Sequence, residues 1–349
     1  MKKLISIVVP AYNEGKCVDE LARRLRLVFD QFADRYDFEA IIVENGSLDD
    51  TYERLLAIRQ ADPRFKIVQL QRNFHMEGGL CAGLAQAKGD ACVVMAGDLQ
   101  DPPELIAQFI PKWEEGYENV YQIVTRRTDN SIFRRVAAQS FYWLLSKLSD
   151  RPVPRNASDF RLVDRRLYEA FNAMPERSRM IRATWTWLGG KSIGIEHERP
   201  PRFGGTSAFN TFATAGYAVR GILASSSTPL KIIPFFGLAF GAISFLLLIG
   251  YAIRAIFFGV PFAGFGTLVS LNLLLFGLLF VFLGVMSEYI GMIYEEVRAR
   301  PTFIIRAAHG LEPVPDTRQA YPAAQLPHGS PLHLNGSAQE AAAARTIDA

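Results

Sequence analysis

The sequence predicts an α/β fold in which a mostly parallel sheet is followed by two apolar segments long enough to cross a membrane. Three observations support this: strand-length apolar runs alternate with helical patterns, polar side chains follow several of those runs, and charges disappear from a later part of the chain. Alternating strands and helices are typical of parallel sheets covered by helices on both faces. A chain of 349 residues can hold one large domain and a smaller part.

The strands and helices of this domain follow from hydrophobic periodicity. Apolar runs of strand length occupy residues 4–9, 38–43, 65–70, 91–96 and 120–124. Helical patterns lie between them at residues 17–33, 51–61, 76–87 and 103–115. A further helix is expected at 131–148. Short helices and an edge strand at 192–197 are expected within residues 155–201.

Composition excludes several classes of protein. The net charge is +3 and no long basic run occurs, so the sequence predicts no nucleic-acid partner. The three cysteines lie far apart without metal-site spacing, which favours a reducing, cytosolic setting. The N-terminal apolar run is too short for a signal peptide, so we interpret it as the first strand.

Two uncharged stretches predict membrane spans. Residues 232–253 and 255–287 hold 22 and 33 residues without a charge, and a span needs about 20. The alternative, a pair of buried core helices, fits these lengths poorly. Only Arg254 lies between the stretches, whereas Lys231 precedes them and Arg298 and Arg300 follow, so both ends of the hairpin are expected in the cytosol.

An acidic segment follows the fourth predicted strand. Residues 97–104, GDLQDPPE, place the carboxylates of Asp98 and Asp101 and the amide of Gln100 at the end of that strand. Ligands of open α/β sheets bind at this edge. Oxygen ligands of this kind suit Mg²⁺ or Mn²⁺, and such a cation suits a nucleotide diphosphate.

Two further turns point to the same edge. Residues 10–14, PAYNE, follow the first strand, and residues 44–47, ENGS, follow the second. Tyr12 offers a ring for a base, and Glu14 offers a hydrogen-bond acceptor. Taken alone, both segments fit ordinary turns with Asn13, Ser47 or Asp49 as helix caps. Their convergence with Asp98 favours a nucleotide site.

Basic residues and one more acid complete the candidates. Arg126, Arg134 and Arg135 could grip a phosphate by bidentate bonds, although a solvated basic face remains the alternative. Asp159 is expected in a loop, where it could accept a proton or orient a nucleophile, or else pair with Arg161 or Arg165. The glycine-containing segment 199–207, RPPRFGGTS, has the composition of a movable lid over a charged ligand.

These motifs resemble, in order, those of family 2 glycosyltransferases. PAYNE, ENGS, QRNF, GDLQDPPELI, SDFRL, PER and ERPPRFGGTS are most similar to the polyprenyl-phosphate glycosyltransferases, over residues 4–306. The resemblance implies a GT-A fold and inverting transfer of a sugar from a UDP- or GDP-sugar to a polyprenyl phosphate, such as undecaprenyl phosphate. It also implies Mg²⁺ or Mn²⁺ and a plasma-membrane location with a cytosolic catalytic domain. Family members often form homo-oligomers.

The resemblance also implies roles for single residues. Nucleotide-sugar binding would fall to Pro10, Tyr12, Glu14, Glu44, Asn45 and Asp98. Asp98 and Gln100 would hold the metal, and Asp159 and Asp98 would be catalytic. The acceptor phosphate would meet Arg126, Arg134, Arg135, Arg202 and Ser207.

The expected domain plan has five parts. These are a GT-A catalytic domain at 1–208, amphipathic juxtamembrane helices at 209–230, a transmembrane hairpin at 231–293 with spans near 232–253 and 267–288, a cytosolic membrane-proximal segment at 294–311 and a disordered tail at 312–349.

The sequence departs from the family pattern at several positions. Ala96 stands where the metal motif usually has its first Asp, which leaves fewer anionic ligands. In the turn after the second strand, where relatives usually have two acids, this chain has Glu44 and Asn45. Met76 and Ala208 stand where relatives usually have lysines. The loss at Ala96 leaves open a non-catalytic nucleotide-sugar-binding scaffold. A processive polysaccharide synthase is a weaker alternative because its Gln-x-x-Arg-Trp motif is absent.

Overall fold

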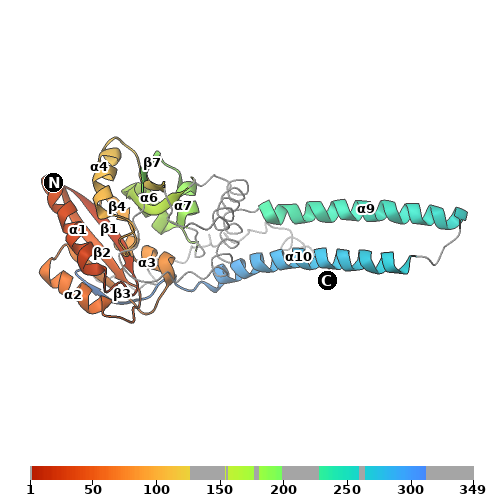
Figure 1. Cartoon of the computed structure of the whole chain (residues 1–349), viewed down its shortest axis with the longest axis horizontal. Coiled ribbons are helices and arrows are strands. Elements are labelled where there is room, and N and C mark those ends of the chain that lie inside the picture. Colours follow the sequence, from red (N-terminus) through yellow and green to blue (C-terminus); the bar gives the residue numbers. More distant parts are fainter. Residues whose placement is uncertain are drawn as a thin grey trace, which may run out of the picture. The chain divides into compact units, whose positions relative to one another are not determined.

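The computed structural model describes residues 2–125, 154, 156–176, 181–198, 228–258 and 264–311 (Figure 1). These residues fall within one compact unit, Met1–Pro313. The predicted helix at 131–148, the predicted lid at 199–207, nearly all of the predicted juxtamembrane segment and the whole of the predicted tail lie outside the described residues.

The described part contains one eight-stranded sheet with the order β7-β5-β6-β4-β1-β2-β3-β8. Strand pairs β1–β2, β1–β4, β2–β3 and β5–β7 are parallel, and pairs β4–β6, β5–β6 and β3–β8 are antiparallel. The predicted α/β architecture with a mostly parallel sheet is therefore confirmed. The strands are β1 (Lys3–Ala11), β2 (Tyr36–Glu44), β3 (Phe65–Leu70), β4 (Ala91–Val94), β5 (Asn119–Val124), β6 (Ala157–Asp164), β7 (Ser192–His197) and β8 (Ile305–His309).

Helices connect most of these strands (Figure 1). The predicted helices before the fifth strand are all present, and the last of them begins with a short 3-10 turn, η1. Their bounds are α1 (Val18–Gln31), α2 (Thr51–Ala61), α3 (His75–Leu84), η1 (Pro103–Leu105), α4 (Ile106–Glu114), α6 (Arg165–Ala173), α7 (Ile181–Leu188), α9 (Thr228–Phe258) and α10 (Phe265–Arg298).

The core lies on both faces of the sheet. On one face, α1 buries Leu21, Leu25 and Phe29, and the Phe29 ring stacks on Phe38 of β2 at 5.0 Å. On the other face, α3 packs against β1 and β2 through glycines, so that its backbone approaches the strands closely. Burial on both faces explains why the first two strands read as near-continuous apolar runs rather than as alternating patterns.

Two strands were not predicted from the sequence. Strand β6 joins β4 and β5 in the sheet, so the expectation that Asp159 lies in a loop is wrong. Strand β8 comes from the segment after α10 and pairs with the edge strand β3. Both strands contain charged residues, so neither forms the continuous apolar run from which the other strands were predicted.

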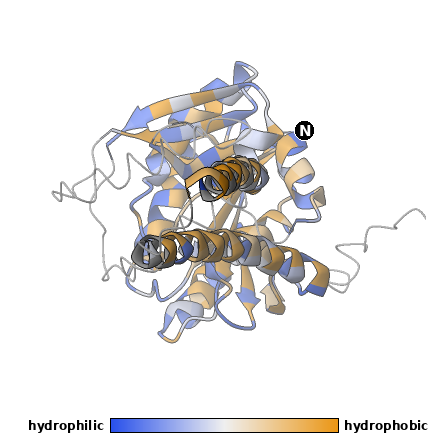
Figure 2. Ribbon diagram, turned by 90° about the vertical axis from the view of Figure 1, so that its right-hand side faces the viewer, coloured by the Kyte–Doolittle hydropathy of each residue, from blue (hydrophilic) through white to orange (hydrophobic). Residues whose placement is uncertain are grey.

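The apolar stretches form the long helices α9 and α10, of 31 and 34 residues. In Figure 2 most of the ribbon of both helices has the colour of hydrophobic residues. The helices contact each other, with the Phe236 and Phe282 rings 6.3 Å apart. Within the described residues, one stretch, Leu274–Arg298, has the length and hydropathy of a membrane span, and none of it is buried. The two-span hairpin stays a prediction.

Candidate active site

Strand topology brings the predicted site segments to one edge of the sheet. Strands β1, β2 and β4 are parallel neighbours, with Ala11 beside Glu44 and Val8 beside Val94. The chain therefore leaves all three strands on the same side, where open α/β sheets bind ligands. Strands β5 and β7 also run parallel to each other, with Val124 beside His197.

The turns after β1 and β2 are cross-linked into one unit. The Asn13 backbone N–H donates to Ser47 Oγ at 3.0 Å, and Asn13 Oδ1 accepts from the Leu48 N–H at 2.8 Å. Asn13 has a φ of 55°, in the left-handed region that Asn tolerates better than most residues. The N-cap positions are Cys17 for α1 and Asp50 for α2, so the cap role considered for Asn13 and Ser47 is wrong.

Predicted nucleotide-binding residues differ in their exposure. Tyr12 is 39% exposed and Glu14 is half-buried, so both can meet a ligand. Pro10 and Glu44 are buried, and the Glu44 carboxylate accepts a hydrogen bond from the Ser47 backbone N–H. This hydrogen bond lets Glu44 hold the turn after β2 in place.

Asn45 connects the same turn to helix α3. Its Nδ2 donates to His75 O at 2.8 Å, and its Oδ1 accepts from the Phe74 backbone N–H at 2.9 Å. Asn45 is 3% exposed, so its side chain mainly holds the start of α3 against the end of β2. The sequence predicted that this amide lies at the site, but it did not predict the hydrogen bonds to His75 and Phe74.

The acidic loop after β4 folds around its own carboxylates. Asp98 Oδ1 accepts from the Gln100 backbone N–H at 3.1 Å, and Asp101 Oδ2 accepts from the Ala96 backbone N–H at 3.2 Å. Asp98 and Asp101 are 7% and 2% exposed. Leu99 between them has a φ of 59°, a conformation rarely adopted outside glycine. The loop thus holds a buried Asp98 just after the end of β4, with Gln100 half-buried two residues later.

Asp98 and Gln100 fit a cation whose ligands come partly from the protein and partly from a substrate. Among the described residues, no group of three or more His, Cys, Asp or Glu side chains is placed to hold a metal ion. Mg²⁺ is commonly bound by one or two carboxylates together with substrate phosphates. One buried carboxylate at Asp98 and the amide of Gln100 match that mode of binding and do not match an all-protein cage.

Asp159 reaches the same edge through strand β6. This strand runs antiparallel to β4, with Val94 beside Arg161, so Asp159 lies next to the chain leaving β4 toward Asp98. Its carboxylate accepts from Arg182 Nε at 2.8 Å and from Arg182 Nη2 at 2.7 Å. In the described part of the chain Asp159 forms its ion pair with Arg182, so the pairing with Arg161 or Arg165 considered from the sequence is wrong.

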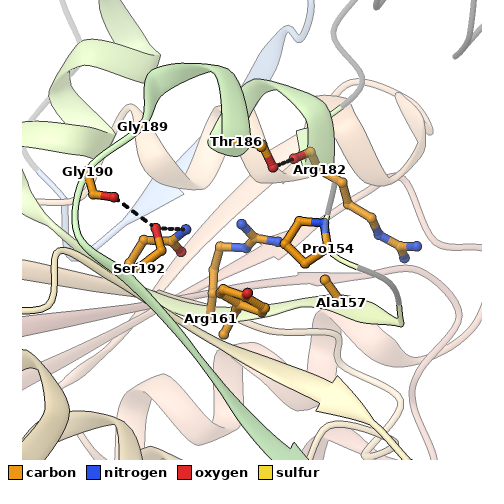
Figure 3. A pocket seen from close by; sticks show the side chains of 10 residues that line it. Pro154, Ala157, Arg161, Arg182, Thr186, Gly189, Gly190 and Ser192 are labelled. Atoms are coloured by element: carbon orange, nitrogen blue, oxygen red, sulfur yellow. Dashed lines mark hydrogen bonds between the residues drawn. The ribbon is translucent and has the colours of Figure 1, made fainter. Parts of the chain in front are cut away.

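A pocket of about 260 Å³ lies beside this ion pair, on the face of β5, β6 and β7 that α7 covers (Figure 3). Arg161 points into it and is 3% exposed. Its guanidinium lies 6.0 Å from the Tyr121 ring and 5.8 Å from the Trp185 ring. Burial lowers the pKa of Arg161 to about 10, although the nearby Asp159 charge opposes that effect.

Sequence reasoning missed Arg182 and the pocket. Arg182 lies on α7 in an apolar, aromatic context, RATWTW, with no motif to mark it. The residues predicted to meet the acceptor phosphate, namely Arg126, Arg134, Arg135, Arg202 and Ser207, lie outside the described residues.

Comparison with known proteins decides the family. The model of glycosyl transferase family 2 matches residues 6–171. The uncharacterized glycosyltransferase YkcC of Bacillus subtilis is 36% identical over 307 residues, which cover 88% of this chain and 94% of the relative. This chain belongs to glycosyltransferase family 2. The glycosyltransferase is also 35% identical, over 88% of its length and 99% of the relative, to the SfII prophage-derived bactoprenol glucosyl transferase of Shigella flexneri.

Solved structures resemble this glycosyltransferase more distantly. Mannosyl-3-phosphoglycerate synthase of Rubrobacter xylanophilus is 16% identical with a TM-score of 0.48, covering 64% of this chain and 73% of the other. Glucosyl-3-phosphoglycerate synthase of Mycobacterium tuberculosis, in complex with Mn²⁺, uridine diphosphate and glucosyl-3-phosphoglycerate, is 19% identical with a TM-score of 0.43, covering 63% and 78%.

Proposed function

We propose that this glycosyltransferase transfers a sugar from a UDP- or GDP-sugar to undecaprenyl phosphate, with glucose as the first candidate sugar. Near-full-length similarity to bactoprenol glucosyl transferases carries the proposal, because 302 to 309 aligned residues extend well beyond the α/β domain. Such an alignment must include most of the chain that follows residue 171, where the family model ends.

The donor would bind where the turns after β1, β2 and β4 converge. Tyr12 would present its exposed ring to the base, while Pro10 and Glu14 line the same turn. Glu44 and Asn45 would act mainly by fixing the β2 turn, as their hydrogen bonds indicate. Preformed backbone at this edge lowers the entropic cost of holding the nucleotide.

A divalent cation, Mg²⁺ or Mn²⁺, would be held by Asp98 and Gln100 together with the diphosphate of the donor. When bound, such a cation neutralises charge on a departing diphosphate as a Lewis acid. Because Ala96 replaces one usual carboxylate, we expect weaker cation binding than in relatives that carry both acids.

The acceptor needs positioning more than deprotonation. A phosphate monoester is already ionised near neutral pH, so the protein contributes by orientation and charge relief. Asp159 would lie beside the reacting groups, and the acceptor phosphate would meet the cationic side chains Arg126, Arg134, Arg135 and Arg202 together with Ser207.

The membrane helices would hold this site at the height of the lipid headgroup. Leu274–Arg298 has the length and hydropathy of a span and would supply one span, and α9 would supply the second. Arginines after the second helix favour a cytosolic domain at the plasma membrane. A homo-oligomer assembled through these helices is part of the same proposal.

A direct assay tests the proposed function. Purified full-length protein in detergent is incubated with undecaprenyl phosphate and each of a panel of radiolabelled UDP- and GDP-sugars, with Mg²⁺, with Mn²⁺ or with a chelator. We expect one donor to yield a labelled lipid, and the chelator to reduce the yield. Failure of every donor would favour the alternative of a nucleotide-sugar-binding scaffold, to which Ala96 in the metal motif points.

Replacing Asp98 tests the metal site. We expect Asp98→Ala to abolish product formation because it removes the carboxylate that would hold the cation. The measurement is transfer rate together with thermal unfolding, and the exposed acid Asp34, changed to Ala, serves as the control. Normal turnover by Asp98→Ala would contradict the assigned metal role.

A further inference from the structure

We infer that Arg182 is a positioning residue for the transfer reaction: it fixes the Asp159 carboxylate in a single orientation at the catalytic edge of the sheet. This inference rests on the proposed function, and it assigns a role to a residue on α7 that no sequence motif marks. Its basis is the geometry of three side chains, Asp159, Arg161 and Arg182.

The first observation is the form of the ion pair. Arg182 donates from Nε to Asp159 Oδ1 at 2.8 Å and from Nη2 to Oδ2 at 2.7 Å. Two parallel bonds from a planar guanidinium fix both the position and the plane of a carboxylate, which a single bond does not. The Asp159 carboxylate is therefore held in one rotamer and one plane.

The second observation is support from the neighbouring backbone. Arg161, on the same strand, donates from Nη2 to the Ser158 carbonyl at 2.8 Å. The Ser158 hydroxyl in turn accepts from the Phe160 backbone N–H at 3.2 Å. The backbone on both sides of Asp159 is thus fixed by Arg161 and Ser158, while Arg182 fixes the side chain.

The third observation is location. The antiparallel register of β4 and β6 sets Asp159 beside the segment that leads to Asp98, and the ion pair borders the pocket of Figure 3. Asp159 and Arg182 are 26% and 33% exposed, so the pair is reachable from solvent. A two-bond arginine–carboxylate pair can also stabilise the fold, so the test has to measure the melting temperature together with the rate.

The chemical consequence concerns what Asp159 does. Both of its oxygens accept bonds from one guanidinium, so Asp159 is presented as an oriented negative charge rather than as an open proton acceptor. An already ionised phosphate nucleophile needs no strong base, which agrees with this arrangement. Displacing a reacting or orienting group by about 1 Å can cost about 100-fold in rate.

Steady-state kinetics on Arg182 variants test the inference. With the donor and undecaprenyl phosphate that give product with the wild type, we expect Arg182→Ala to lower kcat about 100-fold. The KM for the nucleotide sugar and the melting temperature should stay close to wild type. Arg182→Lys keeps the charge but lacks the planar guanidinium that donates two parallel bonds, so we expect an intermediate kcat, about 10-fold below wild type. Added methylguanidine should partly restore Arg182→Ala.

A matched control exists on helix α1. Arg23 makes the same two-bond pair, from Nε and Nη2 to the Glu20 carboxylate at 2.7 and 2.8 Å, although Glu20 also accepts a bond from Arg24. Arg23→Ala removes this two-bond ion pair on α1, and we expect unchanged kcat and no response to methylguanidine. The double variant Asp159→Asn with Arg182→Ala should have a kcat only slightly below that of the more impaired single variant. The effects of substituting two residues that act as a unit are not additive.

The outcomes separate the inference from the function on which it rests. A wild type that makes product, with Arg182→Ala within about 2-fold of it in kcat, overturns the role of Arg182 and leaves the proposed function standing. A lower kcat of Arg182→Ala that is accompanied by a lower melting temperature and is not restored by methylguanidine also overturns the inference, because the role of Arg182 is then structural. A wild type without product for any donor overturns both.

Discussion

At the scale of single residues, the carboxylates at the candidate site differ in what holds them. Asp98 and Asp101 accept hydrogen bonds from backbone N–H groups of their own loop. Asp159 instead accepts hydrogen bonds from the guanidinium of Arg182, which lies on α7. The bonds described for the first two are therefore local in the sequence, whereas the bonds to the third depend on the placement of α7. A local change near residues 96–101 should act on the donor side of the site, and a change in α7 on Asp159.

The variant Asp159→Asn tests this division at the site. An amide would present one oxygen where the carboxylate presents two, so the oriented negative charge and one bond to Arg182 are lost. We expect a loss of about 10² to 10³ in kcat, the range seen when one oriented electrostatic group is removed. The measurement is kcat alongside calorimetric binding of the nucleotide, which should be unchanged. A near-normal rate would remove Asp159 from the mechanism.

At the scale of elements, helix α3 shows how packing places a binding loop. It contains glycines at 78, 79 and 83, and an added Cβ at Gly83 would overlap Val8 Cγ1 and come to 3.1 Å from Val43 Cγ2. The helix therefore lies unusually close to β1 and β2. This closeness brings its first residues within reach of Asn45, which bonds to His75 O and the Phe74 N–H.

Adding one methyl group to this helix tests the packing. We expect Gly83→Ala to lower the free energy of unfolding by about 1–3 kcal/mol, the usual cost of overpacking a filled core. The gain in helix propensity, about 1 kcal/mol, offsets only part of this cost. Chemical denaturation measures the change, with Gln60→Ala on the outer face of α2 as the control. Equal stability of Gly83→Ala and wild type would contradict the predicted overlap.

At the scale of the whole described molecule, the chain returns to its first domain after the long helices. Strand β8 pairs with β3 in antiparallel register, from Ile67 beside His309 to Leu70 beside Ile305. The Gln71 N–H donates to Ile304 O at 2.9 Å, and Tyr52 Oη lies 2.9 Å from His309 Nε2. The segment after α10 thus completes an edge of the sheet that would otherwise be open.

Phe303 anchors this return, since it is 4% exposed. We expect Phe303→Ala to lower the free energy of unfolding by about 3–5 kcal/mol through loss of a buried aromatic ring. Limited proteolysis and thermal unfolding in detergent measure the effect. The neighbouring Ile304, 43% exposed, gives the control Ile304→Ala, for which a much smaller loss is expected. Similar losses in the two variants would show that Phe303 is not the anchor.

The sequence by itself determined the elements whose signals are local. Apolar runs predicted β1 to β5, helical periodicity predicted α1 to α4, and the polar residues at strand ends predicted that the turns after β1, β2 and β4 meet. Parallel neighbouring strands carry this information because their carboxyl ends must lie at one edge. The family motifs GDLQDPPE and PAYNE also lie in these segments, so the family could be recognised from the sequence.

Only the tertiary structure decided what depends on contacts between distant segments. Strand β6 is held by pairing with β4 and β5, and its charged residues gave no period-2 pattern of their own. Likewise, Arg182 pairs with Asp159 from 23 residues away, and β8 reaches β3 from more than 200 residues later in the chain. Burial and pairing of such segments are set by their partners, and no local pattern records which partner will be chosen.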